Sequence, residues 1–321
     1  MQGPLTDLRP RLAQPQGDGL YLVDTDYVRP GLAASHIVAD SGRAAFIDTG
    51  PAPAVPKLLD ALDEIGVGRD QVDYVILTHV HLDHAGGAGQ LMQALPNAQA
   101  VLHPRGAPHL IDPAKLIAGS IAVYGEEQYR RLYGELVPIA AERVRVMADG
   151  GRLTLGARTF EFFDAPGHAK HHHCPVDLDH RDAYAGDNFG ICYREFDTAA
   201  GPFMLPTTTP VQFEPEALHR TIDRLMSYRP RRIVQTHFGP VTELDRLAAD
   251  LHAAIDEFVR IARRHASAPD RSARIRQDMF DYLDRRLDGH GYTGDAATRH
   301  RLIDADVDLN SQGLEVWLSR Q

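Results

Sequence analysis

The sequence predicts an α/β protein with a helical C-terminal extension, and three patterns support that prediction. Short β-type runs alternate with amphipathic helical segments between residues 19 and 240. Turns rich in glycine and polar residues follow several of these runs directly. Beyond residue 242 the apolar positions recur every three or four residues, which is the period of a helix. Alternating strands and helices are typical of sheets covered by helices.

The individual elements can be placed from their local patterns. Three β-type runs separated by turns containing Pro or Gly indicate a meander over residues 20–48. A helix is expected to begin near Pro53 and to end at Gly66, because its apolar residues fall on one face. Further elements are expected at residues 72–77 (strand), about 85–95 (helix), 98–102 (strand), 143–187 (several strands), 214–228 (helix) and 231–236 (strand).

Two segments stand apart from this alternation. Residues 104–138 are punctuated by proline and partly helical, and their length is typical of a lid over a pocket. Residues 242–321 are expected to form one long amphipathic helix followed by shorter helical pieces. We therefore divide the chain into a catalytic domain, residues 1–241, which carries the insertion, and a helical C-terminal region. The leucine stripe from residue 244 is interpreted as packing, with a homodimer surface as the alternative.

The composition is that of a globular protein and excludes several classes of partner. The chain has 321 residues, 43% of them hydrophobic, and a formal net charge of -10, so nucleic acid is not an expected partner. We expect no membrane span and no signal peptide, because the apolar stretches are too short and residues 1–17 lack an apolar segment. Two cysteines without CxxC spacing favour a cytoplasmic protein, in which any metal site uses histidine and carboxylate ligands.

The stretch THVHLDHAGG at residues 78–87 has the spacing of a metal site. In an extended segment alternate side chains share a face, so His79 and His81 can bind one ion together, while Asp83 and His84 lie past the turn. Such a site needs more donors than one pair supplies. Three further donors each follow a β-type run, namely His168 in APGH, Asp187 in AGD and His237 in THFG.

With these pieces together, the sequence resembles the metallo-β-lactamase-fold superfamily of metallo-hydrolases, and within it members of the hydroxyacylglutathione hydrolase and lactonase type. The matching pieces, in order over roughly residues 19–240, are IDTG at 47–50, HxHxDH at 79–84, PGH at 166–168, GD at 186–187 and His237. The resemblance implies a four-layer αββα sandwich with its site at one edge, between two sheets.

The resemblance also implies roles for individual residues. It assigns His79, His81 and His168 to one metal, Asp83, His84 and His237 to a second, and Asp187 to both. It implies that Asp48 of the IDTG turn accepts hydrogen bonds that orient the ligating imidazoles. It also implies that His172 contacts the ligands without binding a metal itself. Phe238 is expected to shape the substrate pocket, and Tyr193 to hydrogen-bond a substrate carbonyl.

These assignments lead to an expected reaction. Two divalent ions, zinc in preference to iron or manganese, would share a bridging hydroxide that attacks a small ester-like substrate, either a thioester or a lactone. Asp83 would accept the proton and deliver it to the leaving group. Two alternatives stay open, a mononuclear iron enzyme of the persulfide dioxygenase type and a phosphodiesterase of the same fold.

Overall fold

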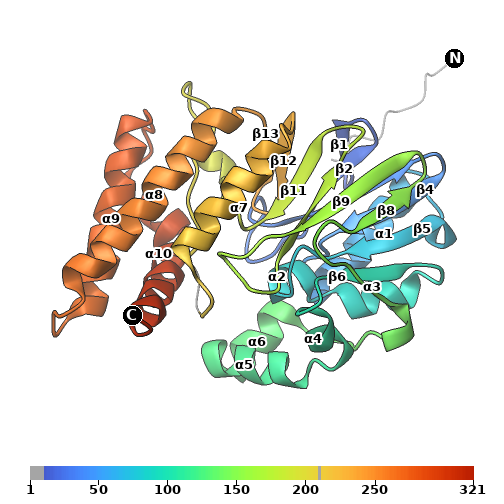
Figure 1. Ribbon diagram of the computed structural model, residues 1–321, viewed down its shortest axis with the longest axis horizontal. Helices are drawn as coiled ribbons and strands as arrows, with labels where there is room; N and C mark the ends of the chain where they lie inside the picture. The colour runs from blue at the N-terminus through green and yellow to red at the C-terminus, as the bar shows by residue number, and fades with distance from the viewer. Residues whose placement is uncertain (1–10, 209–210) are drawn as a thin grey trace, which may run out of the picture.

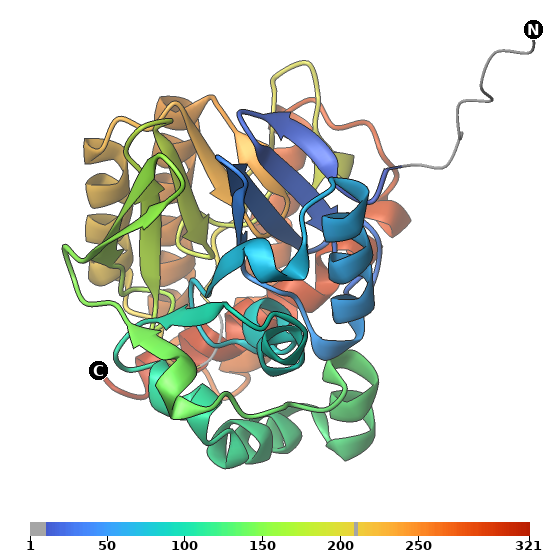
Figure 2. The same cartoon turned by 90° about the vertical axis from the view of Figure 1, so that its right-hand side faces the viewer.

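The computed structural model describes residues 11–208 and 211–321, and it confirms the predicted fold class. Two β-sheets pack face to face, and helices cover the outer face of each sheet (Figure 1). The same layers can be followed from a second side in Figure 2. Residues 1–10, on which part of the signal-peptide prediction rests, lie outside the described residues.

The first sheet has seven strands in sequence order, β1 to β7. Strands β1 to β4 pair antiparallel, which gives the predicted meander, and β4 to β7 pair parallel through helical crossovers. The strands are β1 (Gln14–Gly17), β2 (Leu20–Asp24), β3 (Ala34–Asp40), β4 (Arg43–Ile47), β5 (Val72–Ile76), β6 (Gln99–Leu102) and β7 (Val144–Val146).

The second sheet has six strands in the order β13-β12-β11-β10-β9-β8. All neighbours pair antiparallel except β11 and β12, which are parallel. The strands are β8 (Arg152–Leu155), β9 (Arg158–Asp164), β10 (His173–Asp177), β11 (Asp182–Gly186), β12 (Arg232–Gln235) and β13 (Gly239–Val241). Apolar side chains of both sheets, such as Ile76 and Phe162, fill the space between them.

Helices α1 (Val55–Glu64) and α3 (Ala88–Ala94) pack on the outer face of the first sheet, and α7 (Pro215–Ser227) packs on the second. The helix expected over about 85–95 is α3, and a short helix that was not predicted, α2 (Leu82–Ala85), precedes it and ends at the pair Gly86–Gly87. A Cβ on Gly87 would lie 2.8 Å from Val55 Cγ2, so glycine allows this turn to approach α1 closely. Short 3-10 turns lie at Ala52–Ala54, Arg69–Gln71, Ala141–Arg143 and Arg194–Phe196.

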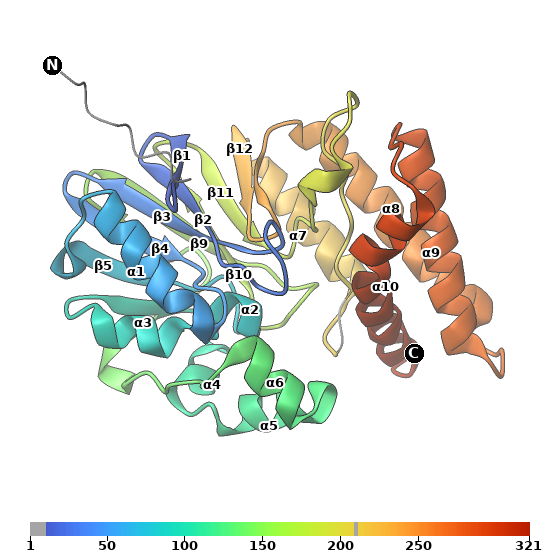
Figure 3. The same cartoon turned by 180° about the vertical axis from the view of Figure 1, so that it is seen from behind.

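The predicted insertion contains α4 (Ala107–Ile111), α5 (Ala114–Tyr124) and α6 (Glu126–Tyr133), which lie below the sandwich in Figure 3. Tyr129 and Tyr133 of α6 form a small apolar cluster with Leu82. Because Leu82 lies between two residues of the predicted metal-binding turn, the insertion contacts that turn directly.

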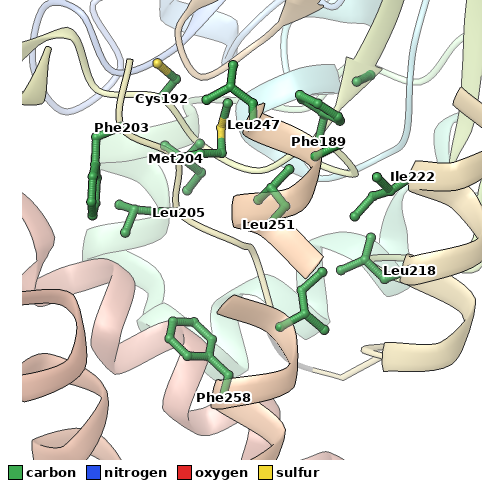
Figure 4. Close-up of a cluster of buried hydrophobic side chains, with 14 of the residues drawn as sticks. Phe189, Cys192, Phe203, Met204, Leu205, Leu218, Ile222, Leu247, Leu251 and Phe258 are labelled. Atoms are coloured by element: carbon green, nitrogen blue, oxygen red, sulfur yellow. The ribbon is translucent and has the colours of Figure 1, made fainter. Parts of the chain in front are cut away.

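The C-terminal region consists of α8 (Leu244–His265), α9 (Arg271–Gly289) and α10 (Ala296–Leu318). The expectation of short pieces after α8 was wrong: α10 has 23 residues, and the Asp295 side chain caps it by accepting from the Thr298 N–H. Figure 4 shows how Leu247 and Leu251 of α8 share one core with Leu218 and Ile222 of α7. The domain division at residue 241 stays a prediction.

Within the described residues, no helix is both long enough and apolar enough for a transmembrane segment.

Candidate metal centre

The predicted metal-binding turn lies between β5 and α2. His79 and His81 follow the end of β5 in an extended segment, and Asp83 and His84 lie on the first turn of α2. The change from strand to helix places His81 and Asp83 in different groups, as the spacing predicted, but His79 and His84 lie together, with ring centroids 4.1 Å apart.

The other three predicted donors come from loops that follow strands of the second sheet. His168 lies between β9 and β10, Asp187 directly follows β11, and His237 follows β12. These strand ends meet the metal-binding turn of the first sheet at one edge of the sandwich. The residues are arranged in three groups, each with one ligand atom per residue within 4.8 Å of the others: His79, His81 and His168; His79, His84 and Asp187; and Asp83, His84 and His237.

The carboxylate of Asp187 lies between the two outer groups. Its Oδ1 is 3.0 Å from His84 Nε2 and 3.6 Å from His237 Nε2, while its Oδ2 is 3.4 Å from His168 Nε2. On the far side, Asp83 Oδ2 is 3.3 Å from His237 Nε2. The two oxygens of Asp187 thus face different groups, as the sequence resemblance implies for a bridging ligand.

Hydrogen bonds fix the orientation of His79 and His84. The Thr78 hydroxyl donates to Asp48, so its oxygen accepts from His79 Nδ1–H, 3.2 Å away. His84 Nδ1–H donates to Asp48 Oδ2 at 2.8 Å. With the proton on Nδ1 in each neutral ring, the Nε2 lone pair points into the group.

His168 and His237 are held in the same tautomer by other acceptors. The Thr207 hydroxyl donates to the Asp187 carbonyl at 3.0 Å, so its oxygen accepts from His168 Nδ1–H, also at 3.0 Å. His237 Nδ1–H donates to the Leu32 carbonyl at 2.6 Å. Four imidazoles therefore present Nε2 to the groups, which is the arrangement a cation requires.

Unpartnered buried atoms support the fit of a cation. Among residues 11–208 and 211–321, His79 Nε2, His84 Nε2 and Asp187 Oδ1 make no hydrogen bond of good geometry, although the last two atoms lie 3.0 Å apart. Buried polar atoms normally have a partner, and leaving one without costs about 1–3 kcal/mol. Three such atoms in adjoining groups of His and Asp are the donor set that zinc, iron or manganese binds.

The imidazoles of the all-histidine group are uncharged at neutral pH. Burial lowers the pKa of His79 well below its ordinary value, and the neighbouring His84 and His81 lower it further. Burial and the neighbouring His168 lower the pKa of His81 to about 3. Burial also lowers the pKa of His168. Neutral imidazoles are the form that binds a metal.

The second group has the opposite charge state. Burial disfavours the charged form of His84, but Asp187 and Asp83 outweigh it and raise its pKa well above the ordinary value. The pKa of His237 is also raised, because the Asp83 hydrogen bond and the Asp187 charge outweigh burial. Burial disfavours the Asp83 carboxylate, but His84 and His237 outweigh it and lower its pKa to about 2. A metal at this group must displace protons.

Asp48 joins the two sheets behind the site. It is fully buried, with a φ of 54°, and its Oδ2 accepts from Thr236 Oγ1 at 2.7 Å in addition to Thr78 and His84. The predicted contact with a ligating imidazole is therefore present at His84. We did not predict the two threonines, although a signal existed: each directly precedes a predicted ligand, in Thr78–His79 and Thr236–His237.

Comparison with known proteins identifies the family. The sequence profile of the metallo-beta-lactamase superfamily matches residues 28–237. The chain belongs to this superfamily. Its members are typically metal-dependent hydrolases.

Curated relatives within the superfamily are distant. A metallo-beta-lactamase fold-containing protein of Sulfurisphaera tokodaii is 25% identical over 177 residues, 54% of this chain and 63% of the relative. A hydroxyacylglutathione hydrolase of Klebsiella pneumoniae is 28% identical over 165 residues, 50% of this chain and 49% of the relative. An acyl-coenzyme A thioesterase of Bos taurus is 25% identical over 186 residues, 53% and 63%. The chain thus spans between half and two thirds of these relatives.

Solved structures of the superfamily share the fold over nearly the whole chain. A family protein from Thermus thermophilus has a TM-score of 0.66 at 20% identity and covers 94% of this chain and 93% of its own. The archaeal protein from Sulfolobus tokodaii has a TM-score of 0.65 at 19% identity, covering 93% and 99%. At this identity the likeness supports the fold alone.

His172, which the resemblance places behind the site, stacks on a predicted ligand. Its ring lies 4.8 Å from that of His79 at an interplanar angle of 19°. The residue is fully buried, and within the described chain neither of its ring nitrogens has a hydrogen-bond partner. A Cβ on Gly186 would lie 2.5 Å from His172 Nε2, so glycine at 186 makes room for the ring. His172 therefore touches the site by packing, and its role stays a prediction.

The two residues expected to contact substrate lie close to the site but have different surroundings. Phe238 follows His237 directly and is partly exposed. Tyr193 is buried, and its hydroxyl donates to the Asp306 carboxylate of α10 at 3.0 Å. Burial raises the pKa of Asp306 to about 6. This hydrogen bond uses the donor that a substrate carbonyl would need, so the predicted role of Tyr193 requires its release from Asp306.

Proposed function

We propose that the protein is a hydrolase that holds two divalent ions, preferably zinc, and cleaves a small ester-like carbonyl substrate, a thioester or a lactone. The observation that carries the proposal is the pair of histidine-containing groups on either side of Asp187, because each offers three ligand atoms and the carboxylate faces both. A single ion would need only one group of three ligands, so the presence of two such groups supports a site for two ions.

A thioester is favoured over other ester-like substrates by the named relatives. The hydroxyacylglutathione hydrolase of Klebsiella pneumoniae and the acyl-coenzyme A thioesterase of Bos taurus both carry names that denote thioester substrates. Because the chain spans only part of each relative, the acyl group and the thiol carrier are not transferred from them.

The chemistry can be divided between the ions and the protein. Two ions held by these groups would supply a Lewis acid for the carbonyl and hydroxide at neutral pH. Asp83 is ionised at neutral pH, since its pKa is about 2, and it can accept a proton and pass it to the leaving group. The Nδ1 hydrogen bonds of His84 and His168 keep their rings from turning during the reaction.

The lid insertion closes the site on one side. Leu82 of the metal-binding turn packs against Tyr129 and Tyr133 of α6, and the hydroxyls of Tyr27 and Tyr133 are 2.8 Å apart. These tyrosines lie close enough to Asp83 for its charge to raise the pKa of both Tyr27 and Tyr133, together with burial, the larger cause. The insertion thus places a largely apolar cluster beside Asp83, which supports a role as a lid that limits access of water to this side of the site.

Metal analysis of the purified protein combined with a substrate panel tests the proposal. We expect about two zinc ions per chain and fastest hydrolysis of thioesters or lactones within a panel that also contains phosphodiesters and β-lactams. A single iron per chain with oxygen uptake on a persulfide would replace hydrolysis with the dioxygenase alternative. Preference for a phosphodiester would retain the metal centre and refute the carbonyl substrate.

A further inference from the structure

The segment 206–208 lies beside the metal centre and is held almost entirely by side chains. Before it, Phe203, Met204 and Leu205 are anchored in the core with Leu247 and Leu251 of α8 (Figure 4). Leu205 pairs with Ile191 through two main-chain hydrogen bonds. For residues 206–208 the described chain provides no main-chain to main-chain hydrogen bond.

Asn310 of the C-terminal helix α10 supplies the missing partners. Its Oδ1 accepts from the Thr208 N–H at 2.5 Å and from the Thr208 hydroxyl at 3.1 Å, and its Nδ2 donates to the Pro206 carbonyl at 3.2 Å. The Asn310 carbonyl also accepts from the Thr208 hydroxyl, at 3.0 Å. Asn310 is 3% exposed, so water does not compete for these bonds. One amide thus binds the residues on both sides of Thr207.

Thr207, between those two residues, contacts the metal centre twice. Its hydroxyl oxygen accepts from His168 Nδ1–H and its hydrogen goes to the Asp187 carbonyl, both at 3.0 Å. His168 belongs to the all-histidine group and Asp187 lies between the groups. A shift of the Thr207 main chain would therefore change the orientation of the His168 ring and the position of the Asp187 main chain.

We infer that Asn310 is a positioning residue for the metal centre, which it serves by fixing Thr207 against His168 and Asp187. The inference rests on the proposed function, because it assumes that His168 and Asp187 bind metal. It makes the C-terminal helix part of the site, although Asn310 is 142 positions from His168 in the sequence.

A second contact of α10 supports this placement. Asp306 lies four residues before Asn310, so the two side chains share a face of the helix one turn apart. Asp306 accepts from the Tyr193 hydroxyl, and the Arg29 guanidinium carbon lies 4.7 Å from the centre of the Tyr193 ring. Two successive turns of α10 thus form hydrogen bonds to segments beside the candidate metal centre. These contacts indicate that α10 packs against the site and is not peripheral to it.

Zinc affinity, measured by competition with a chromophoric chelator, tests the inference without any substrate. We expect Thr207→Val to weaken the affinity of one of the two ions by about tenfold or more, as loss of a hydrogen bond to a ligand does. Asn310→Ala, which acts one step further away, should weaken the same ion by about three- to tenfold. The visible spectrum of the cobalt-substituted protein should change in both variants, because the ligand field reports the His168 geometry.

The double variant separates positioning from a general loss of stability. If Asn310 acts through Thr207, then Asn310→Ala combined with Thr207→Val should bind zinc no more than about twofold more weakly than Thr207→Val alone. Independent effects would instead multiply. Ser311→Ala is the matched control, because Ser311 is a buried neighbour on α10 whose hydroxyl donates to the Asp308 carbonyl of the same helix. It should leave zinc affinity and the cobalt spectrum unchanged.

Two outcomes would overturn the inference. The first is parental zinc affinity and cobalt spectrum in folded Asn310→Ala, and the second is an equal loss in Ser311→Ala. If Asn310→Ala does not fold, Asn310→Asp replaces it, since a carboxylate keeps the acceptor for Thr208 but turns an oxygen toward the Pro206 carbonyl in place of the Nδ2 donor; like Asn310→Ala, it should bind zinc more weakly than the parent. A parent that binds zinc but hydrolyses nothing would refute the proposed function alone, whereas a parent without zinc affinity would refute both.

Discussion

The two outer candidate groups both face Asp187 and differ in almost everything else. The group of His79, His81 and His168 is made of imidazoles alone, and burial, with a smaller effect from neighbouring imidazoles, lowers all three pKa values. The group of Asp83, His84 and His237 contains a carboxylate, and its two imidazoles have raised pKa values. The first group therefore offers lone pairs to an ion, while the second holds protons in the place of an ion.

This difference implies that two ions would bind at the two groups with different affinities. Binding at the first group displaces no proton at neutral pH, so affinity there depends on the geometry of the rings. Binding at the second group exchanges protons for the ion, but the carboxylate adds a favourable charge. We therefore expect the metal affinity of the two groups to depend differently on pH.

Removing the shared carboxylate should have the largest effect. In Asp187→Ala both groups lose the ligand that joins them, and we expect hydrolysis to fall by about three orders of magnitude or more, with less than two ions retained per chain. His81→Ala should approach the same loss through the first group alone. Asp63→Ala, at an exposed position of α1, serves as the control. Near-normal turnover by metal-free Asp187→Ala would contradict the mechanism.

Removing Asp83 should break one group and spare the other. Asp83→Ala takes away a ligand and the predicted proton carrier, so hydrolysis should fall by about a hundredfold or more. Metal content should drop toward one ion per chain, and the remaining ion should stay at the all-histidine group. Elemental analysis beside His81→Ala checks this, because equal metal loss in the two variants would show that the groups are not separable.

The pH dependence of zinc binding should sharpen the contrast with a smaller effect. The raised pKa values of His84 and His237 mean that protons occupy these rings below the raised values, so zinc affinity at the second group should rise with pH, by up to about tenfold per pH unit for each displaced proton. Zinc affinity at the first group should depend less on pH, since burial lowers the pKa values of His79, His81 and His168. Calorimetric titration at pH 5.5 and 7.5 measures both; equal slopes would refute the assignment.

Much of the fold and the local half of the site could be predicted from the sequence. The strand-to-helix change at residues 78–87 is encoded locally, so the separate directions of His79 and Asp83 follow from spacing alone. His168, Asp187 and His237 could be grouped only through the family resemblance, because strand ends from a second sheet converge with no signal in local sequence.

Most of the hydrogen-bond partners that orient the candidate ligands could not be predicted from local sequence patterns. The Leu32 carbonyl at His237 is 205 positions away, and the Thr208 contact with Asn310 spans 102. Such contacts arise from how α10 and the β2–β3 loop dock, which periodicity does not encode. The hydrogen bond from the Tyr193 hydroxyl to Asp306, 113 positions away, depends on the docking of α10 in the same way. The family resemblance supplied Asp48, which holds His84, but no pattern in the sequence indicated the partners of His168 and His237.

Asp48 has a consequence for the order in which the chain folds. Its carboxylate accepts hydrogen bonds from Thr78, 30 positions away at the end of the first sheet's β5, and from Thr236, 188 positions away beyond the second sheet's β12. The second bond cannot form until the N-terminal and C-terminal halves have docked, and loop closure over such a distance comes late. A nascent chain that has not yet added β12 therefore lacks both His237 and this bond, so it cannot assemble the group of Asp83, His84 and His237.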